Sequence, residues 1–372
     1  MSKRTLSTRL HTPIYVAIRA VLGAMLTGDL EGNIRTARAL GRAYSRIEPQ
    51  RVRRTIDTLS VAFPDMPEHE RRRFALLAYE HLFQLGVEVA YTPRLITPST
   101  WSRHVELGDL GQAARLMLSG RACVMITGHC GNWELLGYTM ALLGFPMHAL
   151  YRPLDLKPVD DWVRRTRERR GLVLVDKFGA AELMPRLIAQ GRHVAFIADQ
   201  NAGDRGLFVP FFNRLASTYK SIGLLALNYE LPIICGQARR LTPTHDGRHD
   251  PFQYRVDAID MIMPEDWKHQ PDPLFYISAR YRRALEAMVR RAPEQNLWLH
   301  RYWKSRPRHE HAGKPMPRAM IEKIRALPWT TEADIDRITD WSARDAAELA
   351  SRPPKPSRTV AGAEIPTVDT GT

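Results

Sequence analysis

The chain has 372 residues, of which 44% are hydrophobic and 25% charged, as in a globular protein of one large domain or two. Its three cysteines are too few for a disulfide framework and fit a reducing compartment. The net charge of +14 is uneven, because residues 1–60 hold 11 Lys and Arg against 4 Asp and Glu. Such a field attracts polyanions, either nucleic acid or an anionic membrane surface.

An apolar segment lies within this basic region. Residues 14–26, IYVAIRAVLGAML, are interrupted only by Arg19. The segment is too short for a bilayer core, which needs about 20 residues. It can lie in a membrane interface with Arg19 reaching water, or it can be an amphipathic helix of the core. The sequence leaves both interpretations open.

The pattern from 33 to 95 is helical, with one break at 63–67, and Pro93, Pro98 and Ser99 predict a connector. Strand and helix patterns then alternate, which predicts an α/β fold with a mainly parallel central sheet flanked by helices. The strands are expected at 122–127, 147–151, 172–175, 193–198, 232–237 and 252–259. The helices are expected near 133–143, 158–170, 180–190, 217–229 and 274–292.

The most informative stretch is TGHCGNWE, residues 127–134, between two apolar runs. It predicts a buried strand, a glycine-bracketed turn and a helix with Asn132 as its N-cap. His129 at the strand end and Glu134 in the first helical turn can meet, so that Glu134 orients the imidazole as a general base. A plain structural pair is the alternative. A zinc site at His129 and Cys130 is disfavoured because the cysteines lack metal-ligand spacing.

Further polar groups follow the other strands, where ligands of parallel α/β sheets gather. Asp199 follows the run 193–198 and begins a glycine-punctuated loop, in which Asp199 and Asp204 offer a non-specific metal site. The apolar residues 208–212 suit a core or a wall for an alkyl chain. One or two of the clustered arginines that follow Tyr151 are expected to point inward; they are Arg164, Arg165, Arg167, Arg169 and Arg170.

Residues 295–307, QNLWLHRYWKSRP, interleave aromatic and basic side chains. Such a stretch can bind single-stranded nucleic acid, or it can lie at a membrane interface where Trp and Tyr meet the headgroups. The Pro-, Thr- and Gly-containing tail from 351 has little that can pack and is expected to be disordered.

Five motifs occurring in order resemble the bacterial lipid A biosynthesis acyltransferase family, the late lauroyl and myristoyl transferases related to lysophospholipid acyltransferases. The motifs are GHCGNWE (128–134), YRPLD (151–155), RERRG (167–171), ADQ (198–200) and WLHRYWKSRP (298–307). The resemblance runs from about residue 30 to 307. It implies an enzyme of the inner membrane that moves a fatty acyl group from an acyl carrier protein thioester to a lipid hydroxyl.

In the resemblance, His129 and Glu134 match the catalytic H-x4-E pair, and Arg167 and Asp199 lie where the family has further functional residues. We expect backbone N–H groups near Gly131 and Asn132 to stabilise the tetrahedral intermediate. Acceptor phosphates are expected to bind the cationic side chains Arg152, Arg167 and Lys220.

No metal or other cofactor is expected, because the thioester is already activated. The expected partners are an acyl carrier protein, an anionic lipid acceptor and the cytoplasmic face of the inner membrane, with peripheral attachment and no nucleic acid. A basic nucleic-acid-binding protein and an acyl-thioester hydrolase are the alternatives. The expected organisation is a membrane-associating segment (1–30), an acyltransferase domain (31–310), a helical extension (311–350) and a disordered tail (351–372).

Overall fold

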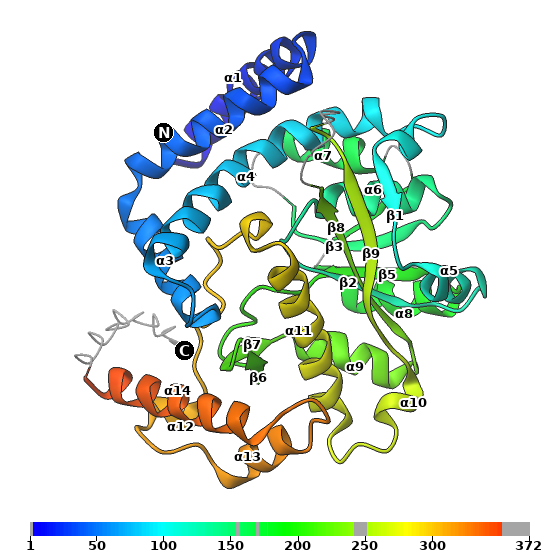
Figure 1. The fold of residues 1–372 in the computed structure, drawn as a ribbon. Coiled ribbons are helices and arrows are strands. Elements are labelled where there is room, and N and C mark those ends of the chain that lie inside the picture. Colours follow the sequence, from blue (N-terminus) through cyan, green and yellow to red (C-terminus); the bar gives the residue numbers. More distant parts are fainter. Residues whose placement is uncertain (1–2, 154–156, 169–170, 177, 242–250, 352–372) are drawn as a thin grey trace, which may run out of the picture.

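A seven-stranded sheet forms the centre of the computed structural model, which describes residues 3–153, 157–168, 171–176, 178–241 and 251–351, with side chains from Pro13 onward (Figure 1). The strand order is β1-β9-β8-β2-β5-β3-β4, and every neighbouring pair is parallel except β8 and β9. The strands are β1 (Val105–Leu107), β2 (Val124–Thr127), β3 (Met147–Tyr151), β4 (Val173–Asp176), β5 (His193–Ile197), β8 (Ile233–Arg240) and β9 (Tyr254–Ile262).

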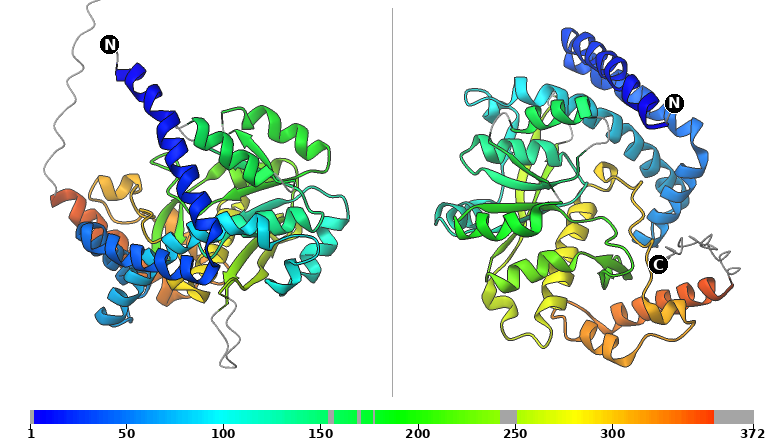
Figure 2. Two further views of the ribbon diagram at one scale, coloured as in Figure 1. Left: turned by 90° about the horizontal axis from the view of Figure 1, so that it is seen from above. Right: turned by 180° about the vertical axis from the view of Figure 1, so that it is seen from behind.

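Helices cover both faces of this sheet (Figure 1, Figure 2). Because strand residues alternate between faces, Val124 and Ile126 of β2 enter one core with helices α8, α9 and α11, whereas Met125 packs against the other core, with α5 and α6. The helices are α5 (Gly111–Leu118), α6 (Trp133–Leu142), α7 (Lys157–Glu168), α8 (Ala180–Ala189), α9 (Lys220–Asn228), α10 (Pro264–Trp267) and α11 (Pro273–Arg291). The predicted α/β architecture is confirmed.

Four helices precede the sheet and form an arm along one side of it (Figure 1). They are α1 (Lys3–Thr27), α2 (Leu30–Ile47), α3 (Pro49–Ala62) and α4 (Glu68–Leu95). The carboxylate of Asp29 caps α2 by accepting from the N–H of Gly32, and Pro93, expected in a connector, lies inside the last turn of α4. Helix α1 contacts α4 and α7 but leaves Val16 and Val21 exposed. None of the described helices is both long and apolar enough to cross a bilayer.

An antiparallel hairpin, β6 (Leu207–Phe211) and β7 (Arg214–Thr218), lies outside the main sheet. The strands β6, β7 and β1 were not predicted from the sequence. The predicted helix at 217–229 begins too early, because β7 continues to Thr218 and α9 begins at Lys220. Val209, Phe211 and Phe212 are buried in the core with α11. Of the two interpretations of residues 208–212, the structure therefore supports core packing.

Three helices follow α11 in the described part of the chain: α12 (Arg308–His311), α13 (Arg318–Arg325) and α14 (Glu332–Ser351). Helix α14 packs against β7 and α12. A buried charge cluster joins them, because Arg306 pairs with Glu310 at 2.7 Å and with Asp345 at 2.6 Å. Beyond Ser351, the predicted disordered tail lies outside the described residues.

Candidate active site

The turn between β2 and α6 is held from two sides. Asn132 begins α6, and its side-chain oxygen accepts the N–H of Leu135 at 2.9 Å, as predicted for an N-cap. Gly131 has a φ of +74°, and a Cβ there would lie 2.1 Å from the carbonyl oxygen of Ala238. The glycine is therefore needed for the approach of the turn to β8, rather than for access of a ligand.

The same packing changes the expected oxyanion donors. The N–H of Gly131 donates to the carbonyl of Gln295 at 2.9 Å, and that of Asn132 donates to Ala238 at 2.8 Å. These N–H groups are already engaged within the fold. The structure thus corrects the prediction that Gly131 and Asn132 supply the donors, because backbone pairing with β8 and with the 295–297 segment was invisible in the sequence.

His129 is held by Asp199, which follows β5. Nδ1 of His129 lies 2.7 Å from Oδ1 of Asp199, and the N–H of His129 donates to Oδ2 at 3.0 Å. Burial alone would raise the pKa of Asp199, but the charge and hydrogen bonds of His129 lower it to about 2. An ionised Asp199 only accepts, so Nδ1 carries the imidazole proton and Nε2 is left as the basic nitrogen.

Glu134 does not have the place predicted for it. Its carboxylate accepts from Nε of Arg167 at 2.7 Å, from Nη2 of the same guanidinium, and from Nε1 of Trp133 at 3.2 Å. Asp199, rather than Glu134, is therefore the carboxylate that orients His129 through Nδ1. The physical reason is that Glu134, on the first turn of α6, faces α7, whereas β5 lies directly beside β2.

A second imidazole lies beside the first. The rings of His129 and His300 are 4.5 Å apart between centroids, and Nε2 of His300 is 3.4 Å from Nε2 of Gln200. Burial lowers the pKa of His300 to about 4, although Asp199 opposes this shift. His300 is therefore neutral near pH 7. The sequence prediction missed it as a site residue, although its motif (298–307) was noted.

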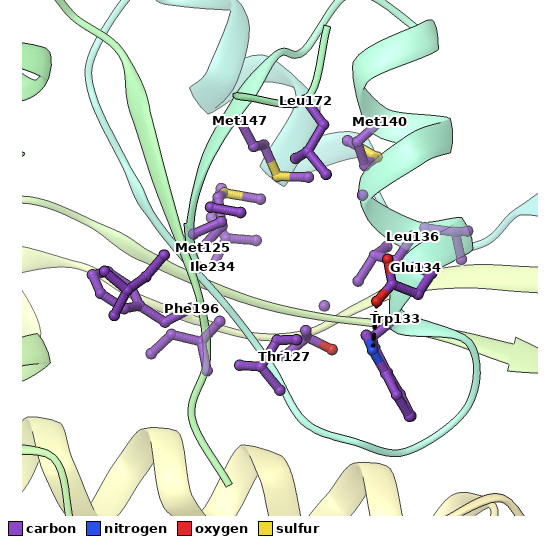
Figure 3. A pocket seen from close by; sticks show the side chains of 18 of the residues that line it. Met125, Thr127, Trp133, Glu134, Leu136, Met140, Met147, Leu172, Phe196 and Ile234 are labelled. Carbon is purple, nitrogen blue, oxygen red and sulfur yellow. Dashed lines mark hydrogen bonds between the residues drawn. The ribbon is translucent and has the colours of Figure 1, made fainter. Parts of the chain in front are cut away.

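A cavity of about 520 Å³ opens beside His129, between α6 and the face of the sheet that packs against α6 (Figure 3). Thr127, Trp133 and Glu134 lie at one end, and Met140, Met147 and Leu172 lie at the other (Figure 3). Apolar side chains form most of the wall between these ends. The cavity therefore joins a polar catalytic end to an apolar interior, as a site for a molecule with an alkyl chain requires.

The predicted cationic residues divide into two groups. Arg152 and Arg167 line the cavity, and the guanidinium of Arg167 also lies over the ring of Tyr151, 5.2 Å from its centroid. Lys220 is exposed at the first position of α9 and is not among the residues that line the cavity. Of the clustered arginines, Arg167 thus points inward, while Arg169 and Arg170 lie outside the described residues.

Among the described residues, His129, Asp199 and His300 are the group whose nitrogen and carboxylate atoms lie within 4.8 Å of one another. Asp204 is exposed and does not belong to this group. Nδ1 of His129 is already bonded to Asp199, which is the arrangement of a proton-transfer pair.

The aromatic residues of the 295–307 stretch are mostly internal. Trp298 and Tyr302 are 2% and 1% exposed and pack against Phe63, Phe211 and Phe212. Neither ring is available for stacking on a nucleic-acid base or for a membrane interface. The stretch instead brings His300 to the catalytic end of the cavity.

Comparisons with known proteins agree with this site. A model of the bacterial lipid A biosynthesis acyltransferase family matches residues 7–305. The lipid A biosynthesis palmitoleoyltransferase of Escherichia coli (strain K12) is 28% identical over 253 residues, which cover 67% of this chain and 77% of the relative. The lauroyltransferase of the same organism is 25% identical, covering 72% and 84%, and the myristoyltransferase is 24% identical, covering 78% and 87%.

The family match covers most of the chain and includes every residue of the cavity and of the His129–Asp199 pair. The relatives are named for transfer of different acyl groups, so the family shares a reaction rather than one acyl chain length. The chain therefore belongs to the bacterial lipid A biosynthesis acyltransferase family and is an acyltransferase.

Proposed function

We propose that this protein transfers a fatty acyl group from an acyl carrier protein thioester to a hydroxyl group of a lipid A precursor or a related anionic lipid. The observation that carries the proposal is the position of His129, whose Nδ1 is bonded to Asp199 at the mouth of an apolar cavity. The names of the relatives, which are lipid A biosynthesis transferases, support this choice of acceptor.

In the proposed reaction, Nε2 of His129 removes the proton of the acceptor hydroxyl as its oxygen attacks the thioester carbonyl carbon. The tetrahedral intermediate collapses, the carbon–sulfur bond breaks, and the imidazolium returns its proton to the thiolate that leaves. Asp199 stabilises the imidazolium in between. The oxyanion donors are the N–H groups of Trp133 and Glu134, since a helix leaves its first N–H groups without intrahelical acceptors.

The apolar part of the cavity holds the acyl chain in this proposal. Met125, Met140, Met147, Leu172 and Ile234 surround it (Figure 3). Burial of each methylene group contributes about 0.8 kcal/mol, so a long chain supplies most of the binding free energy without any polar contact. Arg152, exposed at the cavity mouth, is the cation that we propose for a phosphate of the acceptor. Arg167 is already neutralised by Glu134.

We further propose that α1 attaches the protein to the cytoplasmic face of the inner membrane without crossing it. Val16 and Val21 are 57% and 68% exposed on this helix, which Figure 2 shows projecting along the outside of the molecule. Arg19 on the same helix is exposed, and Arg38 and Arg42 of the next helix share the single carboxylate of Glu80, which leaves one positive charge for anionic headgroups. Val21→Asp should weaken sedimentation with phosphatidylglycerol vesicles, whereas Val173→Asp, at an exposed site on β4, should not.

The test of the acyl transfer is a reaction of the purified protein with lauroyl-acyl carrier protein and a lipid A precursor, followed by mass spectrometry of the lipid. The expected product is the acceptor with one added acyl group, and His129→Ala should lower its rate by about 10²–10⁴-fold. Free fatty acid without acylated lipid would instead identify a thioesterase. We expect EDTA to leave the rate unchanged, because the proposed steps use no metal or cofactor.

A further inference from the structure

A fully buried arginine lies directly behind the catalytic pair. Arg282, in the middle of α11, is 0% exposed, and its Nη1 donates to the carbonyl oxygen of Asp199 at 2.6 Å and to that of Ala198 at 3.3 Å. Its guanidinium carbon lies 4.3 Å from the centroid of the Phe211 ring. Among the described residues, neither Nε nor Nη2 has a hydrogen-bond partner.

This environment is unfavourable for a guanidinium. Burial lowers the pKa of Arg282, although nearby Tyr281 and the Asp199 charge oppose the shift. A buried cation with two unsatisfied nitrogen groups is destabilising, and an apolar side chain of similar volume would often serve the fold as well. Such costly groups are found preferentially at functional sites. The fold alone does not explain why an arginine is present here.

The charges around Asp199 suggest what the arginine does. Six titratable side chains interact with this carboxylate or with the arginine behind it; they are His129, Cys130, Tyr219, Tyr281, His300 and Tyr302. Burial raises the pKa of the three tyrosines and of Cys130 and lowers that of His300, so these five are neutral near pH 7. Besides His129 itself, the charged members of the group are then Asp199 and Arg282.

A lone buried carboxylate would bind the imidazolium form of His129 strongly and leave little free base at neutral pH. A cation behind the carboxylate balances its charge and reduces that effect. We propose that Arg282 is a positioning residue that fixes the main chain of Asp199 and balances its charge, so that less of that negative charge acts on the ring of His129. This inference rests on the proposed role of His129 as general base.

The test compares the pH dependence of kcat/KM for acyl transfer in the wild type, Arg282→Met and Arg282→Lys. Loss of the positive charge should move the acidic limb of the Arg282→Met profile to higher pH by about one unit. Arg282→Lys keeps the charge, so its limb should stay at the wild-type position even if kcat falls. Arg283→Met is the matched control, since this exposed neighbour lies over Trp329 instead of near Asp199.

An Arg282→Met limb at the wild-type position, or an Arg282→Lys limb displaced as far as that of Arg282→Met, would overturn the proposal. If Arg282→Met does not fold, as judged by its thermal melt, an Arg282→Lys limb at the wild-type position supports the proposal and one displaced by about one unit overturns it. A second measurement does not depend on activity: the NMR titration of the His129 ring, assigned with His129→Gln, should show protonation at higher pH in Arg282→Met. If the wild type has no acyl-transfer activity but Arg282→Met still shows this shift of the His129 titration, the proposed function is refuted and the role of Arg282 is not.

Discussion

The carboxylate of Asp199 lies 2.7 Å from Nδ1 of His129, although 70 positions separate the two residues in the chain. They meet because β5 pairs with β2 in parallel, so that the carboxyl ends of both strands reach the same edge of the sheet. The turn that follows β2 carries the base, and the first residue beyond Ala198 carries the carboxylate. The two residues therefore meet because β2 and β5 are neighbours in the sheet.

Asp199→Asn should lower kcat/KM by about 10²-fold or more, because the neutral amide can no longer stabilise the imidazolium that forms during transfer. Single-turnover transfer from lauroyl-acyl carrier protein measures the effect. Asp204→Asn, on the same loop but exposed, should retain wild-type rates. Near-normal turnover in Asp199→Asn, together with an inactive Glu134→Gln, would return the orienting role to Glu134.

Glu134→Gln should remove the charge that neutralises Arg167 at the cavity mouth. We expect a loss of about tenfold in kcat/KM and an acidic limb that stays in place, because this carboxylate does not bond to His129. The double variant with Arg167→Gln should cost less than the sum of the two single variants, since each removes the same ion pair. Additive losses in this cycle would show that the pair does not act as a unit.

His300 should make the fold sensitive to acid. Its pKa is about 4 in the folded protein, below the usual value near 6.5, so the unfolded chain takes up this proton first as the pH falls. The free energy of unfolding is therefore unaffected by His300 above about pH 6.5 and decreases as the pH falls toward 4. At pH 5 the decrease is about 2 kcal/mol. Urea unfolding at pH 7 and pH 5 should show a smaller difference for His300→Gln than for the wild type.

The control for that experiment is His269→Gln, since His269 is exposed. Burial also lowers the pKa of four other histidines, which are His81, His148, His193 and His309. The wild type is therefore expected to lose more stability on acidification than His300 alone accounts for. Equal pH sensitivity in the wild type and His300→Gln would contradict the assignment to His300.

Asp345→Asn should destabilise the contact of α14 with the rest of the protein. Asp345 is 4% exposed and accepts from both Arg306 and Arg214, so its neutralisation leaves two partly uncompensated cations. Breaking one buried pair of this kind costs about 3–5 kcal/mol. The thermal midpoint should fall by several degrees, whereas Asp340→Asn on the same helix should leave it unchanged. An unchanged midpoint for both variants would mean that the cluster contributes no net stability.

The sequence by itself determined the elements and the base. Six apolar runs predicted the strands β2, β3, β4, β5, β8 and β9, and the glycine-bracketed turn placed His129 at a strand end with Asn132 as the N-cap. These features are local, since hydrophobic periodicity and capping depend on neighbouring residues. The ordered motifs also sufficed to indicate the family, since all but the last two residues of the fifth motif lie within the 7–305 match.

Only the tertiary structure decided the partners of those residues. Asp199 rather than Glu134 meets His129, the N–H groups of Gly131 and Asn132 are used by Gln295 and Ala238, and Trp298 turns into the core. Each outcome depends on which strand lies beside β2 and on what packs over its end. Spacing along the chain does not encode these choices, because long-range pairing is settled by the burial and hydrogen bonding of the whole fold.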